Sequence, residues 1–167
     1  MNIFYLDPNP KIAAQMMCDK HVIKMILESA QMLCTAHRVL DGDDYADKYS
    51  LYKMVHKNHP STIWVRSGRL NYLWLYNHMR ALMQEYTYRY GKIHASERLN
   101  MGLSGRPQNM DENAPFTEPP QCMPDQYKNE KSTVQAYQNY YHGEKARFAE
   151  WRLGQPDWWK GGELWIS

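Results

Sequence analysis

Residues 10–40 carry apolar side chains at every third or fourth position. At about 100° per residue, this spacing predicts one helix with an apolar face that packs against a core. Asp19 and His37 fall within that face. The rest of the face consists of Ile12, Met16, Ile23, Ile26, Ala30, Leu33 and Cys34. A carboxylate on such a face has to be paired, neutralised or used, because an unpaired buried charge is very costly. Asp19 is therefore either a structural ion pair or an acid placed for catalysis or binding.

The opposite face of the same predicted helix is polar. His21 and Glu28 lie within about 20° of each other on it, with Lys24 between them. A histidine, a carboxylate and a lysine so arranged can transfer protons or bind a phosphate. The alternative is a solvated charged face. The face holds Lys20, Lys24, Glu28, Gln31 and Arg38.

Residues 60–90 form the second predicted helical region, which Pro60 begins and Gly91 ends. Gly68 is a candidate break within it. Its polar stripe carries Arg66, Arg69 and Arg80. Residues 51–106 as a whole hold nine Lys and Arg against two acidic residues. Such a block predicts a polyanionic partner, unless the acidic residues that follow compensate it in space.

The remaining chain completes an all-α prediction. Residues 95–127 are rich in Pro, Gly and Asn without a period, which predicts a long irregular loop. Residues 131–152 form a third predicted helix, and residues 153–167 a packed aromatic C-terminal tail. We expect a compact single domain over residues 1–167, with about three main helices and no strand.

Composition and missing motifs narrow the function. No run of about 18 apolar residues occurs, so we expect no membrane partner, and the first ten residues lack a signal-peptide pattern. Three widely spaced cysteines favour the reducing cytoplasm. Without nucleotide-binding or metalloprotease motifs, we expect no cofactor. His56 and His59 have no evident third ligand, so no metal is expected; a capping turn or a contact to phosphate or base is physically easier.

The tail contains Trp158 and Trp159, followed by Lys160. Aromatic rings next to a cation are typical of surfaces that bind unstacked bases. Core packing by the C-terminal segment is the alternative.

Four stretches, in this order and spacing, resemble the phage-type pyrimidine-dimer DNA glycosylases with AP-lyase activity, the phage endonuclease V family. Together they span about two thirds of the chain. They are NHPST (Asn58–Thr62), YTYRYGK (Tyr86–Lys92), MPDQYK (Met123–Lys128) and QPDWWK (Gln155–Lys160).

The resemblance implies an all-α fold in which the N-terminal segment lies between helices. It also implies an α-amino group that attacks the sugar C1′, a first-helix glutamate beside that amine, and arginines that hold the phosphates of a kinked duplex. Two positions differ from the family pattern. Asn2 is large, which disfavours removal of Met1, and Val22 stands where the glutamate is expected. Asp19 and Glu28 are the carboxylates that can take its place.

The sequence thus predicts a DNA base-excision enzyme, an N-glycosylase for a pyrimidine base or dimer. Asp19 is the predicted charged catalytic group, assisted by His21, Glu28 or an N-terminal amine at Asn2. Two mechanisms are open: hydrolysis by an activated water, and attack by an amine that forms an imine. The alternatives are a nucleic-acid-binding module and an enzyme of free pyrimidine nucleotides. We expect a monomer that binds duplex DNA through Lys20, Lys24, His59, Arg66, Arg69, Arg80, Trp158, Trp159 and Lys160.

Overall fold

The computed structural model describes residues 1–161, and this part of the chain contains helices and loops but no strand. The predicted all-α class is confirmed. The α-helices are α1 (Pro10–Met16), α2 (Asp19–Asp41), α3 (Asp43–Lys48), α4 (Pro60–Arg66), α5 (Arg69–Tyr90), α6 (Asn100–Ser104) and α7 (Thr133–Tyr140). The shorter turns are the 3₁₀ helices η1 (Ala95–Leu99) and η2 (Asp125–Tyr127), and the π-helix η3 (Tyr141–Lys145).

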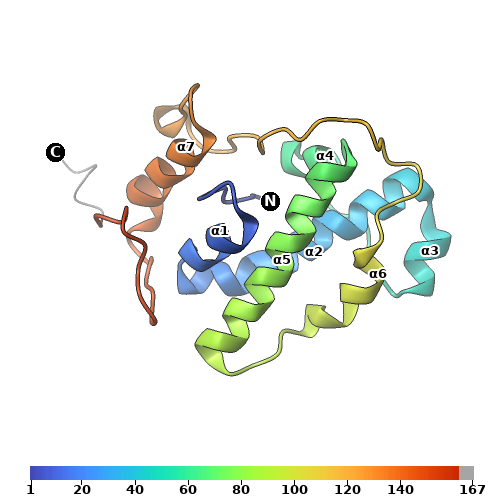
Figure 1. Ribbon diagram of the computed structural model, residues 1–167, viewed down its shortest axis with the longest axis horizontal. Coiled ribbons are helices and arrows are strands. Elements are labelled where there is room, and N and C mark those ends of the chain that lie inside the picture. The colour runs from blue at the N-terminus through green and yellow to red at the C-terminus, as the bar shows by residue number, and fades with distance from the viewer. Residues whose placement is uncertain (162–167) are drawn as a thin grey trace.

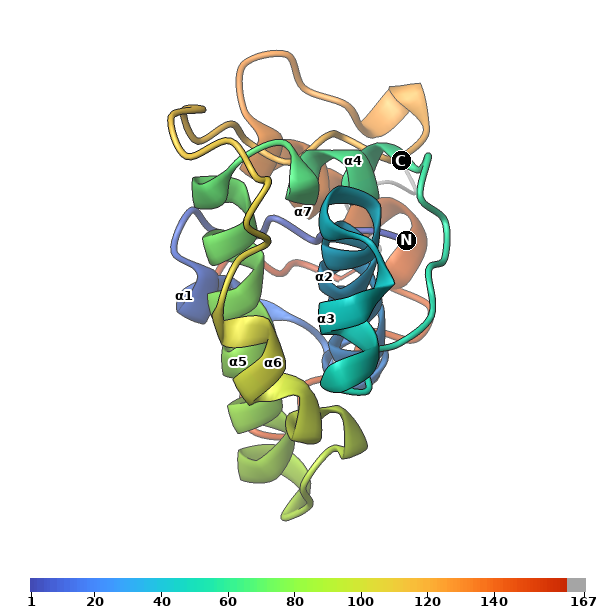
Figure 2. The ribbon, with the colours of Figure 1, turned by 90° about the vertical axis from the view of Figure 1, so that its right-hand side faces the viewer.

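The two long helices, α2 and α5, pack against each other at the centre of the molecule (Figure 1). Helices α1 and α4 also pack against this pair, while α3 and α6 lie at the end opposite α7. The chain that follows α6 passes over α4 to reach α7 (Figure 2). Residues 3–6 are buried within the resulting core, so the N-terminal segment is held between helices.

The predicted single helix over residues 10–40 is wrong, because the chain breaks between α1 and α2. Met17 and Cys18 have extended backbone, with ψ angles of 140° and 159°. The buried side chain of Arg89 donates hydrogen bonds to the carbonyl oxygens of Met17 and Gln15, at 2.7 and 2.9 Å. The Asp19 amide instead donates to the carbonyl of Glu150 at 2.8 Å. Long-range partners thus replace the hydrogen bonds that a continuous helix would make.

Other helix boundaries follow local signals. Asn9 caps α1 by accepting hydrogen bonds from two backbone amides, and Pro10 occupies the first helical position. The predicted break at Gly68 separates α4 from α5. Helix α5 ends at Gly91, whose φ of 68° lies in the left-handed region that glycine adopts without strain.

Two predicted segments differ from the structure. The loop predicted for residues 95–127 contains η1, α6 and η2. The third helix predicted for residues 131–152 leaves α-geometry at Tyr140 and continues as the π-helix η3. At this point the η3 backbone packs closely on Tyr127, and a Cβ on Gly143 would overlap the ring.

The described part of the C-terminal tail packs against the body. Trp158 and Trp159 lie edge-on to Tyr141, with ring centroids at 5.9 and 6.4 Å. Residues 162–167 of the predicted tail, including Trp165, lie outside the described residues. Within residues 1–161, no helix is both long and apolar enough to cross a membrane.

Three buried histidines link the helices. His21 shares a 2.7 Å hydrogen bond with the Tyr141 hydroxyl, and His37 shares one of 2.8 Å with Tyr72. His78 donates from Nδ1 to the Pro10 carbonyl at 2.9 Å. Burial lowers the pKa of His21 to about 3 and those of His37 and His78 to about 4. All three are therefore neutral at pH 7.

The packing of η3 can be tested with Gly143→Ala. The added methyl group has to displace the Tyr127 ring, so we expect a loss of about 1–3 kcal/mol in unfolding free energy, measured by urea denaturation. Gly105→Ala is the matched control, because the nearest atom to its Cβ would be the Tyr45 hydroxyl at 3.9 Å. Equal stability of the two variants would contradict this packing.

The buried histidines predict a stability that falls in mild acid. Below pH 6.5 the unfolded chain protonates these histidines while the folded chain does not, so the unfolding free energy decreases as the pH falls toward 4. Each histidine contributes at most about 1.4 kcal/mol per pH unit. His78→Gln should reduce the slope between pH 6.5 and 5 in denaturant titrations, whereas His56→Asn, at an exposed position, should not. A slope that His78→Gln leaves unchanged would refute the assignment.

Candidate active site

An amine and a carboxylate meet where the N-terminal segment passes α2. The amino nitrogen of Met1 lies 3.4 Å from Oε1 of Glu28, and the side chains of these two residues are 3% and 15% exposed. The Lys24 ammonium lies 3.8 Å from the other oxygen, Oε2. The amine is therefore held against a largely buried carboxylate that has a second cation beside it.

Asn2 fixes the position of this amine. Its Nδ2 donates to the carbonyl of Cys122 at 2.9 Å, and its Oδ1 accepts hydrogen bonds from the Tyr137 hydroxyl and the Ile3 amide at 2.8 and 3.0 Å. These contacts engage both the amide nitrogen and the amide oxygen of Asn2. They also tie the N-terminal segment to residues more than a hundred positions later in the chain.

A paired amine and carboxylate have a defined chemical capability. A neutral amine is a nucleophile for an electron-poor carbon, and a carboxylate within a few ångströms can accept the proton that the amine loses and return it later. Such chemistry needs no metal. Within residues 1–161, no cluster of three or more His, Cys, Asp and Glu could bind a metal ion.

His59 lies at the start of α4 on the same side of the site. Its Nδ1 accepts a hydrogen bond from the Ser61 amide at 3.1 Å, which leaves the proton on Nε2. Burial lowers the pKa of His59, and the charge of the Met1 amine lowers it further. Nearby, Arg66 donates to the Lys57 carbonyl at 2.6 Å. The α4 end of the site thus offers the Nε2–H donor of His59, and the guanidinium of Arg66 is held at Lys57, two residues before His59.

Asp19 is engaged elsewhere. It pairs with the buried guanidinium of Arg89 at 3.1 Å, and its other oxygen accepts the backbone amide of Arg152 at 3.0 Å. Arg89 also pairs with Glu85 at 3.1 Å. This arrangement favours the structural interpretation of Asp19.

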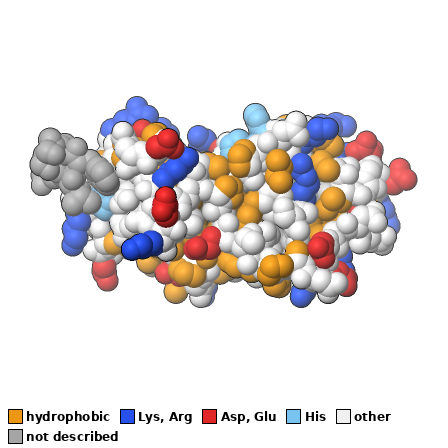
Figure 3. All heavy atoms as spheres, turned by 90° about the horizontal axis from the view of Figure 1, so that it is seen from above, with side chains coloured by type: hydrophobic (Ala, Val, Ile, Leu, Met, Phe, Trp, Pro, Cys, Tyr) orange, Lys and Arg blue, Asp and Glu red, His pale blue; other side chains and the backbone are white. Residues whose placement is uncertain are grey.

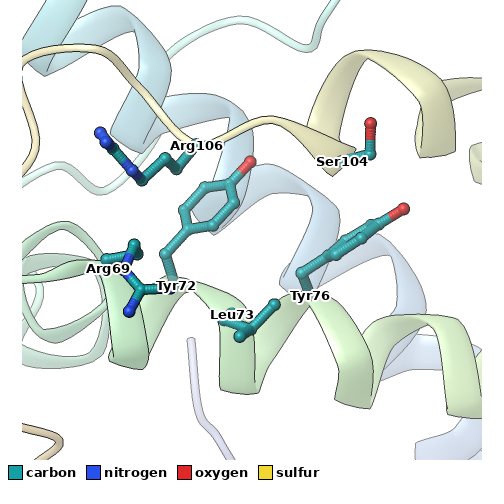
Figure 4. A pocket seen from close by; sticks show the side chains of 6 residues that line it. All are labelled: Arg69, Tyr72, Leu73, Tyr76, Ser104 and Arg106. Atoms are coloured by element: carbon teal, nitrogen blue, oxygen red, sulfur yellow. The ribbon is translucent and has the colours of Figure 1, made fainter. Parts of the chain in front are cut away.

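The predicted DNA-binding arginines lie on α4 and α5, and their role in phosphate binding stays a prediction. Arg69 and Arg80 lie on the exposed face of α5, whereas Lys24 and Glu28 lie on the face of α2 that points away from their shared interface. Arg69 lines a separate cavity of about 170 Å³ with Tyr72, Leu73, Tyr76, Ser104 and Arg106 (Figure 4). Seen from above, basic and acidic side chains are interspersed over the surface (Figure 3).

His21 and the tail aromatics lie within packed networks. His21 stacks on Phe4 with ring centroids 4.3 Å apart, and Trp159 stacks on His142 at 4.9 Å. Trp158 donates from its indole nitrogen to the Met16 sulfur at 3.4 Å. The backbone amide of Lys160 donates to His142 at 3.0 Å. Their predicted roles in catalysis and base stacking stay predictions.

Sequence patterns missed two basic residues, Lys145 at the end of η3 and Arg147 just beyond it. Both lie within cation–π distance of the Phe148 ring, as does Lys20 near the start of α2. A continuous helix was predicted here, and no local signal reveals a π-turn.

Comparison with known proteins identifies the family. No curated protein and no solved structure matches the chain. The family model described as pyrimidine dimer DNA glycosylase matches residues 1–98, more than half of the 167 residues. The matched region contains Met1, Glu28, Lys24 and His59. The chain therefore belongs to the pyrimidine dimer DNA glycosylase family.

Proposed function

We propose that this protein is a DNA N-glycosylase with AP-lyase activity that excises pyrimidine dimers from duplex DNA, with the Met1 amine as nucleophile. The observation that carries the proposal is the 3.4 Å separation between that amine and Glu28 within the matched region. The family supports DNA as the substrate. The lyase step and the identity of the nucleophile go beyond the family match and belong to the proposal alone.

The Met1 amine and the Glu28 carboxylate have different roles in the proposed reaction. The neutral amine attacks C1′ of the damaged nucleotide, the bond from C1′ to the base breaks, and the base leaves with the electron pair and takes up a proton. Glu28 accepts a proton from the attacking nitrogen. The nitrogen lone pair then forms a C1′ imine as the bond to the ring oxygen breaks, and that oxygen takes a proton.

The imine makes the C2′ proton acidic. Its removal expels the 3′ phosphate and breaks the strand, which is the lyase step. Lys24, which pairs with Glu28, and His59, whose pKa the charge of the Met1 amine helps to lower, can bind the backbone beside Glu28. Asp19 has no part in this scheme, because Arg89 and the Arg152 amide occupy both of its oxygens. We assign Asp19 to holding the corner between α1 and α2.

Nicking of supercoiled plasmid tests the function. We expect nicking that requires ultraviolet irradiation of the plasmid, and a covalent protein–DNA adduct after borohydride reduction. The protein's intact mass should show a free amino group at Met1. A two-residue N-terminal extension should abolish both nicking and adduct in a protein that still folds, as a cooperative thermal unfolding transition would show.

Other outcomes point to other functions. Nicking without irradiation would point to a different base or nucleic acid. Binding without nicking or adduct would favour a binding module. Hydrolysis of free pyrimidine nucleotides in place of DNA would favour the nucleotide enzyme.

Two variants on α2 separate the candidate carboxylates. Glu28→Gln should lower the excision rate of the folded protein by about 10²–10⁴-fold, because the amine loses its proton acceptor. Asp19→Asn should cost about 1–3 kcal/mol of unfolding free energy, since it weakens a buried network, yet keep the excision rate of the folded protein. Single-turnover kinetics and urea denaturation measure both. The reverse pattern would make Asp19 the catalytic carboxylate.

A further inference from the structure

A second cavity lies at the end of the molecule that holds α3 and α6, opposite α7 (Figure 1). Its volume is about 340 Å³, within the range of about 300–1,000 Å³ that small-molecule sites occupy. The end of α2, the start of α3 and the chain after α6 line it. The residues of the lining that matter here are His37, Asp41, Asp44, Tyr45, Arg106 and Asn109. The proposed function uses none of them.

His37 lies at the bottom of this cavity, and one of its ring nitrogens has no partner. Only 1% of His37 is exposed, whereas Asp44 and Asn109 at the rim are exposed. Nε2 of the ring lies 2.8 Å from the Tyr72 hydroxyl, but among residues 1–161 no group forms a hydrogen bond with Nδ1. Buried polar atoms without a partner are rare, and each one costs free energy. Nδ1 is therefore a place where a hydrogen-bonding group from outside the chain would fit.

The hydrogen bonds of Tyr72 determine which kind of group Nδ1 requires. The single proton of the Tyr72 hydroxyl goes to the Leu103 carbonyl at 2.7 Å, so this hydroxyl accepts a hydrogen bond from Nε2 of His37. Burial lowers the pKa of His37 to about 4, although the charge of Asp41 and the Gly105 carbonyl oppose the shift. The ring is thus neutral at pH 7, and with its proton on Nε2 it is an acceptor at Nδ1. The Gly105 carbonyl is also an acceptor and cannot satisfy Nδ1, so the ligand has to be a donor.

The charges of the lining favour a cation. Asp44 is exposed, and within residues 1–161 it pairs with no Lys, Arg or His. Asp41 accepts hydrogen bonds from the backbone and side-chain amides of Asn109 at 3.0 and 2.9 Å, which hold the rim of the cavity in place. Arg106, the basic residue of the lining, already pairs with Glu112. Two carboxylates beside a buried acceptor attract a positively charged donor and repel an anion.

The acceptor is held in position by its neighbours. The ring of His37 stacks on that of Tyr45, with centroids 5.0 Å apart and an interplanar angle of 13°. The Tyr45 hydroxyl donates to the Gly102 carbonyl at 2.7 Å, which ties α3 to α6 across the cavity wall. A site that is rigid before binding loses less entropy when the ligand arrives. Tyr45 also lines the cavity, so its ring offers an apolar surface to an alkyl chain.

We propose that this cavity binds a small molecule that carries a primary ammonium group on an alkyl chain. A primary ammonium has three N–H donors on one atom. One of them donates to Nδ1 of His37, and the others are directed at the carboxylates of Asp41 and Asp44, while the alkyl chain lies against Tyr45. A quaternary ammonium has the charge without the donors, and an alcohol has a donor without the charge, so neither satisfies the site.

Side-chain nitrogen NMR of the full-length protein at neutral pH tests the acceptor. Without ligand, His37 should appear as a neutral ring with its proton on Nε2. n-Propylammonium chloride should then shift the Nδ1 resonance saturably, with a dissociation constant in the millimolar range, which suits a ligand of only a few non-hydrogen atoms. Tetramethylammonium chloride and n-propanol are the matched probes and should leave the resonance unchanged. A proton on Nδ1, no shift with n-propylammonium, or equal shifts with all three probes would overturn the proposal.

Variants locate the bound ammonium, with the backbone amide resonance of Asn109 as the signal. Asp44→Asn should raise the dissociation constant for n-propylammonium about 3–6-fold, the effect of losing one exposed charge pair in water. Glu118→Gln is the matched control, because Glu118 is also exposed and lies outside the cavity, and it should bind as wild type does. His37→Phe should abolish saturable binding in a protein that still unfolds cooperatively. If His37→Phe does not fold, Asp44→Asn decides, and wild-type affinity in that variant would overturn the proposal.

The ammonium site is independent of the proposed function. His37 follows Glu28 by nine residues of α2, which separates them by about 13 Å along the helix axis at the usual rise per residue. The titration contains no DNA, so a specific shift at Nδ1 would support the site even if irradiated plasmid were never nicked. Dimer excision by a protein that does not bind n-propylammonium would remove only the ammonium site.

Discussion

The buried guanidinium of Arg89 determines how the N-terminal third of the molecule is arranged. It donates hydrogen bonds to the carbonyls of Gln15 and Met17 and pairs with Asp19 and Glu85. Burying one charge is costly, but here every side of the guanidinium has a partner, and breaking such a network costs several kcal/mol. Because these contacts end α1 and restart the chain as α2, they set the rotation of α2. That rotation leaves the largely buried Glu28 and the exposed Lys24 beside the N-terminal segment.

Much of the fold could be predicted from the sequence because its signals are local. Pro10 and Pro60 begin helices, Gly68 separates two of them, and Gly91 ends α5. These residues act through their own φ angles or through amides a few positions away. The break at Met17 and the π-turn at Gly143 could not be predicted in this way. They depend on Arg89 and Tyr127, which lie far away in sequence and meet them only in the folded chain.

The residues of the site also divide into those that local sequence signals predict and those that only the folded chain brings together. Helical periodicity drew attention to Asp19, since a carboxylate on an apolar face is unusual, and the structure supplies a partner for it. Glu28 lies on the polar face, where periodicity alone cannot distinguish a functional residue from a solvated one. The family resemblance implied a glutamate beside the amine, but at Val22. Only the path of residues 1–6 across α2 shows that Glu28, almost two turns later, meets the amine.

The family match ends at residue 98, yet residues beyond it complete the site. Asn2 is held by the Cys122 carbonyl and the Tyr137 hydroxyl, so the position of the amine depends on the segment before α7 and on α7 itself. Tyr137 is fully buried and Tyr141 anchors His21 beneath Phe4. A nucleophile on a chain terminus would otherwise sample many positions, and fixing it in advance lowers the entropic cost of attack. The C-terminal third therefore supplies the rigidity that the first 98 residues need in order to place their amine against Glu28.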